Sequence, residues 1–156
     1  MIYVFDTSSF IVTGHYYPQR FSSFWENFNE AVLDGNIIST REVLNELDNS
    51  ACKPHLLDWI KRNKNIFLTP ASEETSYVSK IFSNPHFMQA VSKRNILKGM
   101  PVSDPFVVAL AKVKNATVVT EEEFKANAAK IPNICQVHKI KCVCIEKFME
   151  QEGWQF

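Results

Sequence analysis

The sequence has little glycine and little cysteine, and each scarcity argues against a class of protein. Four glycines in 156 residues argue against a collagen repeat, flexible linkers and the glycine-rich loops that bind phosphate. Four cysteines are too few for a disulfide-stapled fold and indicate a reducing cytoplasm. No apolar run is long enough to span a bilayer, and the apolar residues 1–5 carry no basic leader. We therefore expect neither a membrane segment nor a signal peptide.

The chain also lacks an excess of charge of one sign, because 17 basic residues balance 17 acidic ones. The distribution is uneven. Residues 1–50 hold seven acids and two bases, whereas residues 51–156 hold ten acids and fifteen bases. One acid-free stretch contains Lys80, Lys93, Arg94 and Lys98, and a second basic cluster consists of Lys61, Arg62 and Lys64. Such clusters are usually solvated helix faces; the alternative is contact with a polyanion.

Short apolar runs typical of buried strands alternate with segments of helical periodicity. The expected strands cover residues 2–5, 37–39, 66–68, 117–120 and about 141–144. The expected helices cover residues 21–33, 40–48, 56–62, a segment from 72, a segment from 84 to 99, a segment from 104 through 113, and the C-terminus. This alternation predicts an α/β fold with three layers, α/β/α, around a central parallel sheet. Because no linker or repeat interrupts the chain, we expect a single domain over residues 1–156.

Acidic residues follow the ends of the expected strands, where parallel sheets place their chemistry. Asp6 ends the first strand, and three consecutive glutamates, residues 121–123, follow the strand at 117–120. Asp104 begins a helix, and Glu46 lies one helical turn after Glu42. Converging carboxylates repel one another unless a cation lies between them. Oxygen ligands without His or Cys select Mg²⁺ or Mn²⁺, and such clusters typically act on phosphate esters.

Most of these acids also have a purely structural interpretation. Asp104 before a proline is a good helix N-cap, the three glutamates could form an acidic first helical turn, and Glu42 and Glu46 could be solvated helix charges. Asp6 has no capping role if it simply ends a buried strand. The hydroxyls of the three residues after Asp6 could hold its carboxylate or donate to phosphate.

The stretches that hold these acids resemble, in their order, the motifs of the PIN domain family of metal-dependent ribonucleases. They are VFDTS at residues 4–8, STREVLNEL at 39–47, SDPFVVALA at 103–111 and VVTEE at 118–122. No single stretch is specific, but the four together at these intervals are, and the resemblance covers nearly the whole chain. The stretches KIPNIC at 130–135 and GWQF at 153–156 are similar to a little-characterised prokaryotic branch of that family.

The resemblance implies that Asp6, Glu46 and Asp104 bind Mg²⁺ or Mn²⁺ as the first three acids of the site. The family's fourth position usually reads Thr-x-Asp or Thr-x-Asn. In this chain that pattern falls on Thr120 and Glu122.

Because three glutamates are consecutive, the identity of the fourth acid stays open, with Glu121 as the second choice after Glu122 and Glu123 as the third member of the run. The hydroxyls of Thr7, Ser8 and Thr120 would position Asp6 or the metal-bound water.

The function implied by the resemblance is an endoribonuclease that cleaves single-stranded RNA, with Lys93, Arg94 and Lys98 against the RNA backbone. The small size is similar to that of a VapC-type toxin, which implies a cognate antitoxin protein. We also expect a homodimer and a cytoplasmic location. The alternatives are an RNA-processing nuclease outside a toxin–antitoxin pair and a non-catalytic module that holds RNA or a partner protein.

Two further groups of residues receive structural interpretations. Cys135, His138, Cys142 and Cys144 have a spacing that matches no common zinc site, so buried thiols are the favoured interpretation. The aromatic residues Phe21, Phe24, Trp25 and Phe28 recur at helical spacing and predict core or dimer interface rather than a surface that stacks on bases.

Overall fold

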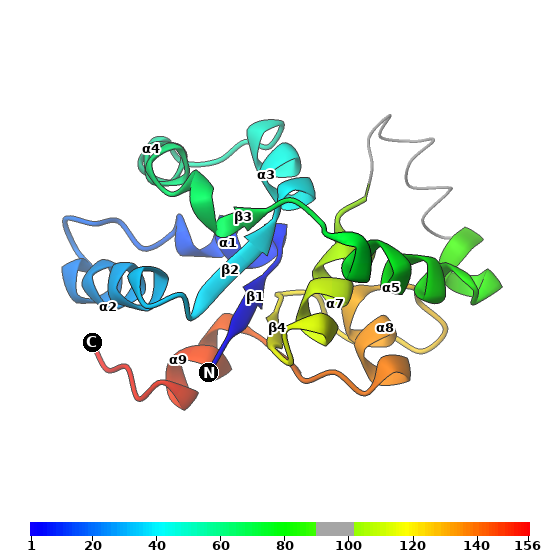
Figure 1. Cartoon of the computed structure of the whole chain (residues 1–156). Helices are drawn as coiled ribbons and strands as arrows, with labels where there is room; N and C mark the ends of the chain where they lie inside the picture. The colour runs from blue at the N-terminus through cyan, green and yellow to red at the C-terminus, as the bar shows by residue number, and fades with distance from the viewer. Residues whose placement is uncertain (90–101) are drawn as a thin grey trace.

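The computed structural model describes residues 1–89 and 102–156, and a parallel sheet lies at its centre (Figure 1). The strands are β1 (Tyr3–Phe5), β2 (Ile37–Thr40), β3 (Phe67–Leu68), β4 (Thr117–Val119) and β5 (Cys142–Val143). Their order is β3-β2-β1-β4-β5, and every neighbouring pair is parallel. The predicted α/β fold with a central parallel sheet is confirmed. Because β1 lies in the middle, the residues that follow it lie at the centre of the sheet's carboxyl edge.

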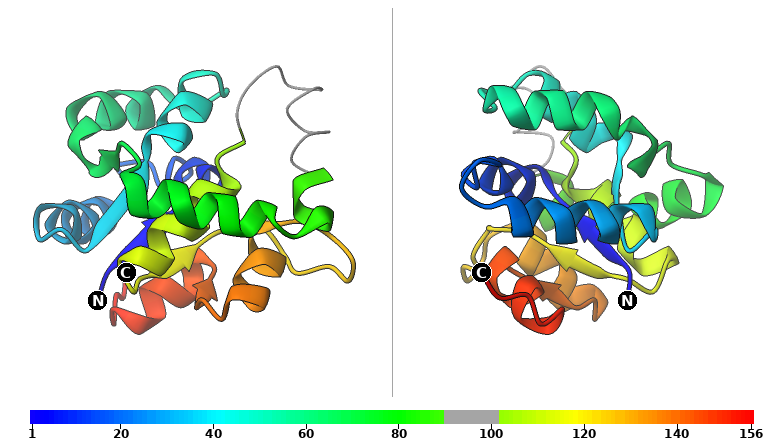
Figure 2. Two further views of the ribbon diagram at one scale, coloured as in Figure 1. Left: turned by 45° about the vertical axis from the view of Figure 1, so that its right-hand side comes forward. Right: turned by 90° about the vertical axis from the view of Figure 1, so that its left-hand side faces the viewer.

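Helices cover both faces of the sheet. They are α1 (Thr7–Thr13), α2 (Ser22–Leu33), α3 (Arg41–Asp48), α4 (Pro54–Arg62), α5 (Ser72–Phe82), α7 (Asp104–Val113), α8 (Ile131–His138) and α9 (Ile145–Gln151). A 3₁₀ turn, Lys64–Ile66, precedes β3, and residues 85–89 are also helical. In Figure 2, α2 and α9 lie on one side of the sheet, and α5 and α7 lie on the other. No helix in the described residues is both long and apolar enough to cross a bilayer.

Aromatic side chains join the sheet to the helices on one of its faces. The fully buried ring of Phe5 contacts Phe10 of α1, Phe28 of α2 and Phe148 of α9. On the other face, α7 packs against β1, β2 and β4. An apolar residue at every position of β1 is therefore needed, because both faces of this strand are covered. The aromatic residues predicted as core are buried at Phe24, Trp25 and Phe28, whereas the fourth, Phe21, is exposed and packs on Tyr16.

Most expected elements are present, with ends that differ by one or two residues, and the larger differences are the following. Helix α1 was not expected, because its Thr-Ser-Ser start indicates a loop by local propensity; Asp6 caps it and Phe10 anchors it in the core. Helix α8 was not expected either. Ile66 lies in the 3₁₀ turn rather than in a strand, and the glutamates at 121–123 lie outside any helix. The helix expected from Asn84 to Gly99 begins at residue 85, and its part beyond residue 89 lies outside the described residues.

Candidate active site

Asp6 is the most enclosed acid of the site, with 3% of its surface exposed. Its Oδ1 accepts hydrogen bonds from the Ser9 amide at 2.7 Å and from the Ser8 hydroxyl at 2.9 Å. Its Oδ2 accepts from the Thr120 hydroxyl at 2.6 Å and from Ser8 at 2.8 Å. Burial raises the pKa of the Asp6 carboxyl, and the hydrogen bonds from these three donors oppose that rise only in part. The expectation that Asp6 has no capping role is wrong, because the bond from Ser9 makes it the N-cap of α1.

Glu46, on α3, links two distant parts of the chain. Its Oε2 accepts a short hydrogen bond from the Thr7 hydroxyl, and its Oε1 accepts from the Ser103 amide at 2.9 Å. Thr7 directly follows Asp6, and Ser103 directly precedes Asp104. Glu46 therefore ties the residue after Asp6 and the residue before Asp104 to α3. The interpretation of Glu46 as a solvated helix charge is wrong.

Glu42, one turn earlier on α3, is also not a solvated charge. It is buried, one of its oxygens pairs with the exposed guanidinium of Arg41 at 2.9 Å, and the other is buried without a hydrogen-bond partner. Its contacts do not join those of Asp6 and Glu46. Glu42 is therefore a structural ion-pair residue beside the site rather than part of the hydroxyl and amide network.

Asp104 is the first residue of α7, and it is buried. The N-cap position belongs to Ser103, so the interpretation of Asp104 as the N-cap is wrong. A carboxylate in the first turn is favoured by the positive end of the helix dipole, and the following proline suits this position because it needs no amide hydrogen there. The start of α7 thus carries both Asp104 and the amide that holds Glu46.

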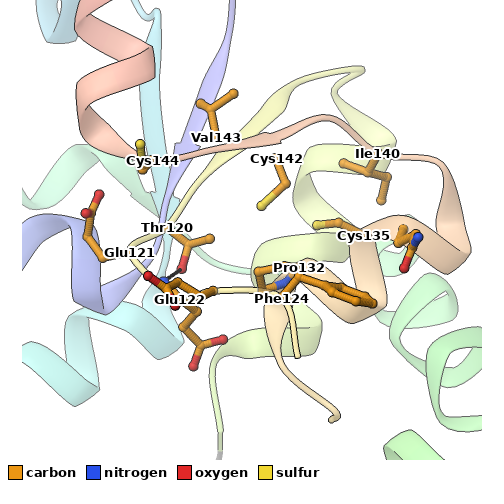
Figure 3. Close-up of a pocket in the computed structure, with 12 residues that line it drawn as sticks. Thr120, Glu121, Glu122, Phe124, Pro132, Cys135, Ile140, Cys142, Val143 and Cys144 are labelled. Carbon is orange, nitrogen blue, oxygen red and sulfur yellow. Dashed lines mark hydrogen bonds between the residues drawn. The ribbon is translucent and has the colours of Figure 1, made fainter. Parts of the chain in front are cut away.

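The loop after β4 is tied to Asp6 through two hydroxyls. The Ser8 hydroxyl accepts from the Glu121 amide at 2.9 Å. The Thr120 hydroxyl accepts from the Glu122 amide at 3.1 Å, as Figure 3 shows. Each hydroxyl thus donates to Asp6 and accepts from this loop. Thr120 and Ser8 thereby set the position of the acidic loop relative to Asp6.

The three consecutive glutamates differ in what their carboxylates contact. Glu121 accepts from the Ile145 amide at 2.7 Å at the start of α9, and Glu122 accepts from the Ile131 amide at 2.9 Å at the start of α8. Glu123 is exposed. The interpretation of these residues as an acidic first helical turn is wrong, because they instead satisfy free amides of two later helices. Each of the first two uses one carboxylate oxygen in that contact.

The site offers only oxygen donors, which in kind suit Mg²⁺ or Mn²⁺ rather than zinc. In their described positions the carboxylates face hydroxyls and amides. Within residues 1–89 and 102–156, no three His, Cys, Asp or Glu side chains are grouped so that they could hold a metal ion. The donor chemistry fits a hard divalent cation, whereas the side-chain positions do not by themselves assemble its coordination sphere.

A pocket of about 640 Å³ adjoins the acidic loop and contains three cysteines. Figure 3 shows the sulfur atoms of Cys135 and Cys142 pointing toward each other, while Cys144 points away. His138 is engaged elsewhere, because its Nδ1 pairs with the Tyr77 hydroxyl at 2.8 Å. The interpretation as buried thiols is confirmed for Cys135, whereas Cys142 and Cys144 are half-buried.

Sequence reasoning missed two backbone amides of the network, those of Ser9 and Ser103. No sequence signal pointed to them, because every residue except proline carries a backbone amide. The predicted RNA contacts Lys93, Arg94 and Lys98 lie outside the described residues.

Residues 3–156 match the family described as Domain of unknown function (DUF4411), and the chain therefore belongs to that family. No curated protein matches the sequence. A chain in the crystal structure of VapBC2 from Rickettsia felis, bound to a DNA fragment from their promoter, is similar with a TM-score of 0.52 at 16% identity. The match covers 92% of this chain and 98% of that one. PAE2754 from Pyrobaculum aerophilum gives a TM-score of 0.48 at 10% identity over 99% and 91% of the two chains.

The similarity to the Rickettsia felis chain supports a three-layer, PIN-like fold. At 16% identity it is a likeness of fold alone. The predicted resemblance to PIN domains is thus supported for the fold, while the family that the sequence matches is DUF4411.

Proposed function

We propose that this DUF4411 chain is a metal-dependent endoribonuclease that cleaves single-stranded RNA and is the toxin of a toxin–antitoxin pair. The observation that carries the proposal is the bridge made by Glu46. Through Thr7 and Ser103, this one carboxylate gathers the residues next to Asp6 and Asp104 at the carboxyl edge of a parallel sheet. Ligands of such sheets bind at this edge, and acids concentrated there suit a phosphate ester bound through a cation.

In the proposed enzyme, Asp6, Glu46 and Asp104 hold Mg²⁺ or Mn²⁺, and the loop after β4 supplies the fourth acid. A bound cation of this kind lowers the pKa of a water molecule and neutralises charge on the phosphoryl oxygens. Glu122 is our first choice for the fourth acid, because its amide donates to the Thr120 hydroxyl, and that hydroxyl in turn donates to Asp6. Glu121 is the second choice, and Glu123 is the third.

The hydroxyls of the site have a positioning role in this proposal. Ser8 and Thr120 hold both oxygens of Asp6, and Thr7 holds one oxygen of Glu46. Two buried or half-buried carboxylates are thereby kept in fixed orientations before a cation arrives.

Several partners belong to the proposal. RNA is the substrate, and Lys93, Arg94 and Lys98 would contact its backbone. The similar chain of known structure comes from the VapBC2 assembly, which favours an antitoxin protein as partner. We further propose a homodimer in the cytoplasm.

The test is cleavage of total RNA by the purified chain with Mn²⁺ or with a chelator, compared between wild type and Asp6→Asn. Asp34→Asn is the matched control, because Asp34 is exposed at the end of α2. We expect discrete fragments with Mn²⁺, none with chelator, and none from Asp6→Asn. Cleavage by Asp6→Asn at the wild-type rate would refute the site.

The same variants, induced in a surrogate bacterium, separate the remaining functions. Growth arrest that requires Asp6 supports a toxin. Cleavage without arrest favours an RNA-processing nuclease. RNA binding without cleavage favours a non-catalytic module.

A further inference from the structure

Two thiols face each other in the lining of the pocket of about 640 Å³ beside the acidic loop, and the proposed cleavage of RNA uses neither of them. Figure 3 shows the sulfur atoms of Cys135 and Cys142 pointing toward each other, and the two thiols share a hydrogen bond. Cys144, in the same lining, points away from this pair. The pocket therefore presents two thiols in contact, with a third thiol nearby that can serve as a control.

The backbone holds the thiol pair in place from both sides. Cys135 lies in α8, and its carbonyl accepts from the Ile140 amide at 2.9 Å. The chain turns between them through Lys139, whose backbone is left-handed with a φ of 54°. Cys142 then pairs with Val118 of β4 as part of the edge strand β5. The contact between the thiols is therefore set by a tight turn and by the register of the sheet.

The two thiols differ in access. Cys135 has 1% of its surface exposed, whereas Cys142 is half-buried. The hydrogen bond with Cys142, together with burial, raises the pKa of the Cys135 thiol, so Cys135 is poorly suited to attack an oxidant first. An accessible thiol beside a protected one is the arrangement in which the second thiol resolves the oxidised form of the first.

We propose that Cys142 and Cys135 form a reversible disulfide when the chain meets a peroxide. The Cys142 thiolate attacks one oxygen of hydrogen peroxide, the O–O bond breaks, and the other oxygen leaves as hydroxide and takes up a proton. Cys142 is then a sulfenic acid. The Cys135 sulfur attacks the Cys142 sulfur, the S–O bond breaks, and the hydroxyl leaves as water with the proton of the Cys135 thiol. In total, two thiols are oxidised to one disulfide and one hydrogen peroxide is reduced to two water molecules.

The disulfide would join α8 covalently to the edge strand of the sheet. The first amide of α8, that of Ile131, donates to Glu122 at 2.9 Å, so the helix that the bond fixes also holds a residue of the acidic loop. The proposed cytoplasmic location suits a bond of this kind, because disulfides in that compartment are usually transient and redox-sensing. The inference goes beyond the proposed nuclease and does not depend on it.

The test treats the reduced full chain with hydrogen peroxide, blocks the remaining thiols with N-ethylmaleimide and measures the intact mass and the tryptic peptides. Wild type should lose two hydrogen atoms and yield peptide 131–139 joined to peptide 142–147, and dithiothreitol should reverse both changes. Because the second peptide also holds Cys144, Cys144→Ser is the matched control, and it should keep the joined peptides. Serine suits this position, which is the N-cap of α9.

The variants of the pair should behave differently from each other. Cys135→Ser should lose the joined peptides and leave Cys142 as a sulfenic acid, which dimedone traps. Cys142→Ser should also lose the joined peptides but leave Cys135 unoxidised, because the Cys135 thiol is buried.

Wild type and Cys144→Ser decide the proposal, so it can be refuted even if a variant of the pair does not fold. A wild type that keeps both thiols in peroxide, or that oxidises Cys142 irreversibly without forming the bond, overturns the proposal. A bond that disappears in Cys144→Ser, or one that joins two molecules on a non-reducing gel, overturns it as well. The measurement uses neither RNA nor metal, so a failure of the proposed nuclease would leave its result unchanged.

Discussion

Replacing Thr120 by valine removes one hydroxyl and almost nothing else, because the two side chains have nearly the same shape. Thr120 is 2% exposed. Its hydroxyl donates to Asp6 Oδ2 at 2.6 Å and accepts from the Glu122 amide at 3.1 Å. Thr120→Val therefore takes one of three donors from the buried Asp6 carboxylate and the acceptor from the Glu122 amide.

The expected cost follows from the two lost bonds. A hydrogen bond to an ionised group contributes about 1.5–3 kcal/mol, and a neutral one contributes about 0.5–1.5 kcal/mol. Because Glu122 is half-buried, water can replace part of the bond to its amide. We therefore expect the free energy of unfolding at pH 8 to fall by about 2–4 kcal/mol.

The cost of Thr120→Val should depend on pH. The bond from Thr120 lowers the pKa of the Asp6 carboxyl against the larger effect of burial. Without that bond the pKa rises further, so the variant loses more stability where Asp6 is ionised. Near pH 4 or below the carboxyl is protonated in the folded protein, and the cost should shrink by about 1 kcal/mol.

Urea unfolding at both pH values measures these free energies. Thr117→Val is the matched control. Thr117 is also buried in β4, but within the part of the chain that the structure describes its hydroxyl makes one hydrogen bond, a long one of 3.9 Å to the Met1 sulfur. We expect it to change stability by less than about 1 kcal/mol. Equal effects of the two variants at pH 8, or a Thr120→Val effect that is the same at pH 4 and pH 8, would refute the assignment of Thr120 as a donor to an ionised Asp6.

Two further predictions concern buried titratable groups. The pKa of Asp6 is raised, so the folded protein binds this proton more tightly than the unfolded chain does. The stability of the wild type should therefore decline relative to that of Asp6→Asn as the pH rises above about 4. Urea unfolding from pH 4 to 8 measures this difference in stability, and a difference that stays constant would contradict the prediction. The thiol of Cys135 is 1% exposed, and its hydrogen bond with Cys142, together with burial, raises its pKa. Iodoacetamide at pH 8 should therefore label the half-buried Cys144 before Cys135, and peptide mass spectrometry showing equal rates would be evidence against this packing.

Much of the fold could be read from local sequence patterns. The runs at 2–5, 37–39 and 117–120, rich in apolar and β-branched residues, became β1, β2 and β4, because such residues suit strands that are covered on both faces. Parallel strands bring their carboxyl ends to one edge, so the positions of Asp6 and Thr120 in the sequence already predicted that they lie close together. Helix α1 escaped prediction because Thr7, Ser8 and Ser9 favour turns locally, whereas Asp6 and Phe10 stabilise the helix in the folded protein.

Which hydroxyl or amide each acid contacts was decided only by the tertiary structure. Glu46 contacts Thr7 and Ser103, and no periodicity connects residues so far apart in the chain. Glu121 and Glu122 are equivalent in sequence, yet one holds the start of α9 and the other holds the start of α8. The sequence alone thus determined which residues are acidic and near which edge of the sheet they lie. Packing determined the partner of each oxygen, because a hydrogen bond depends on distances that are set only when the helices have packed on the sheet.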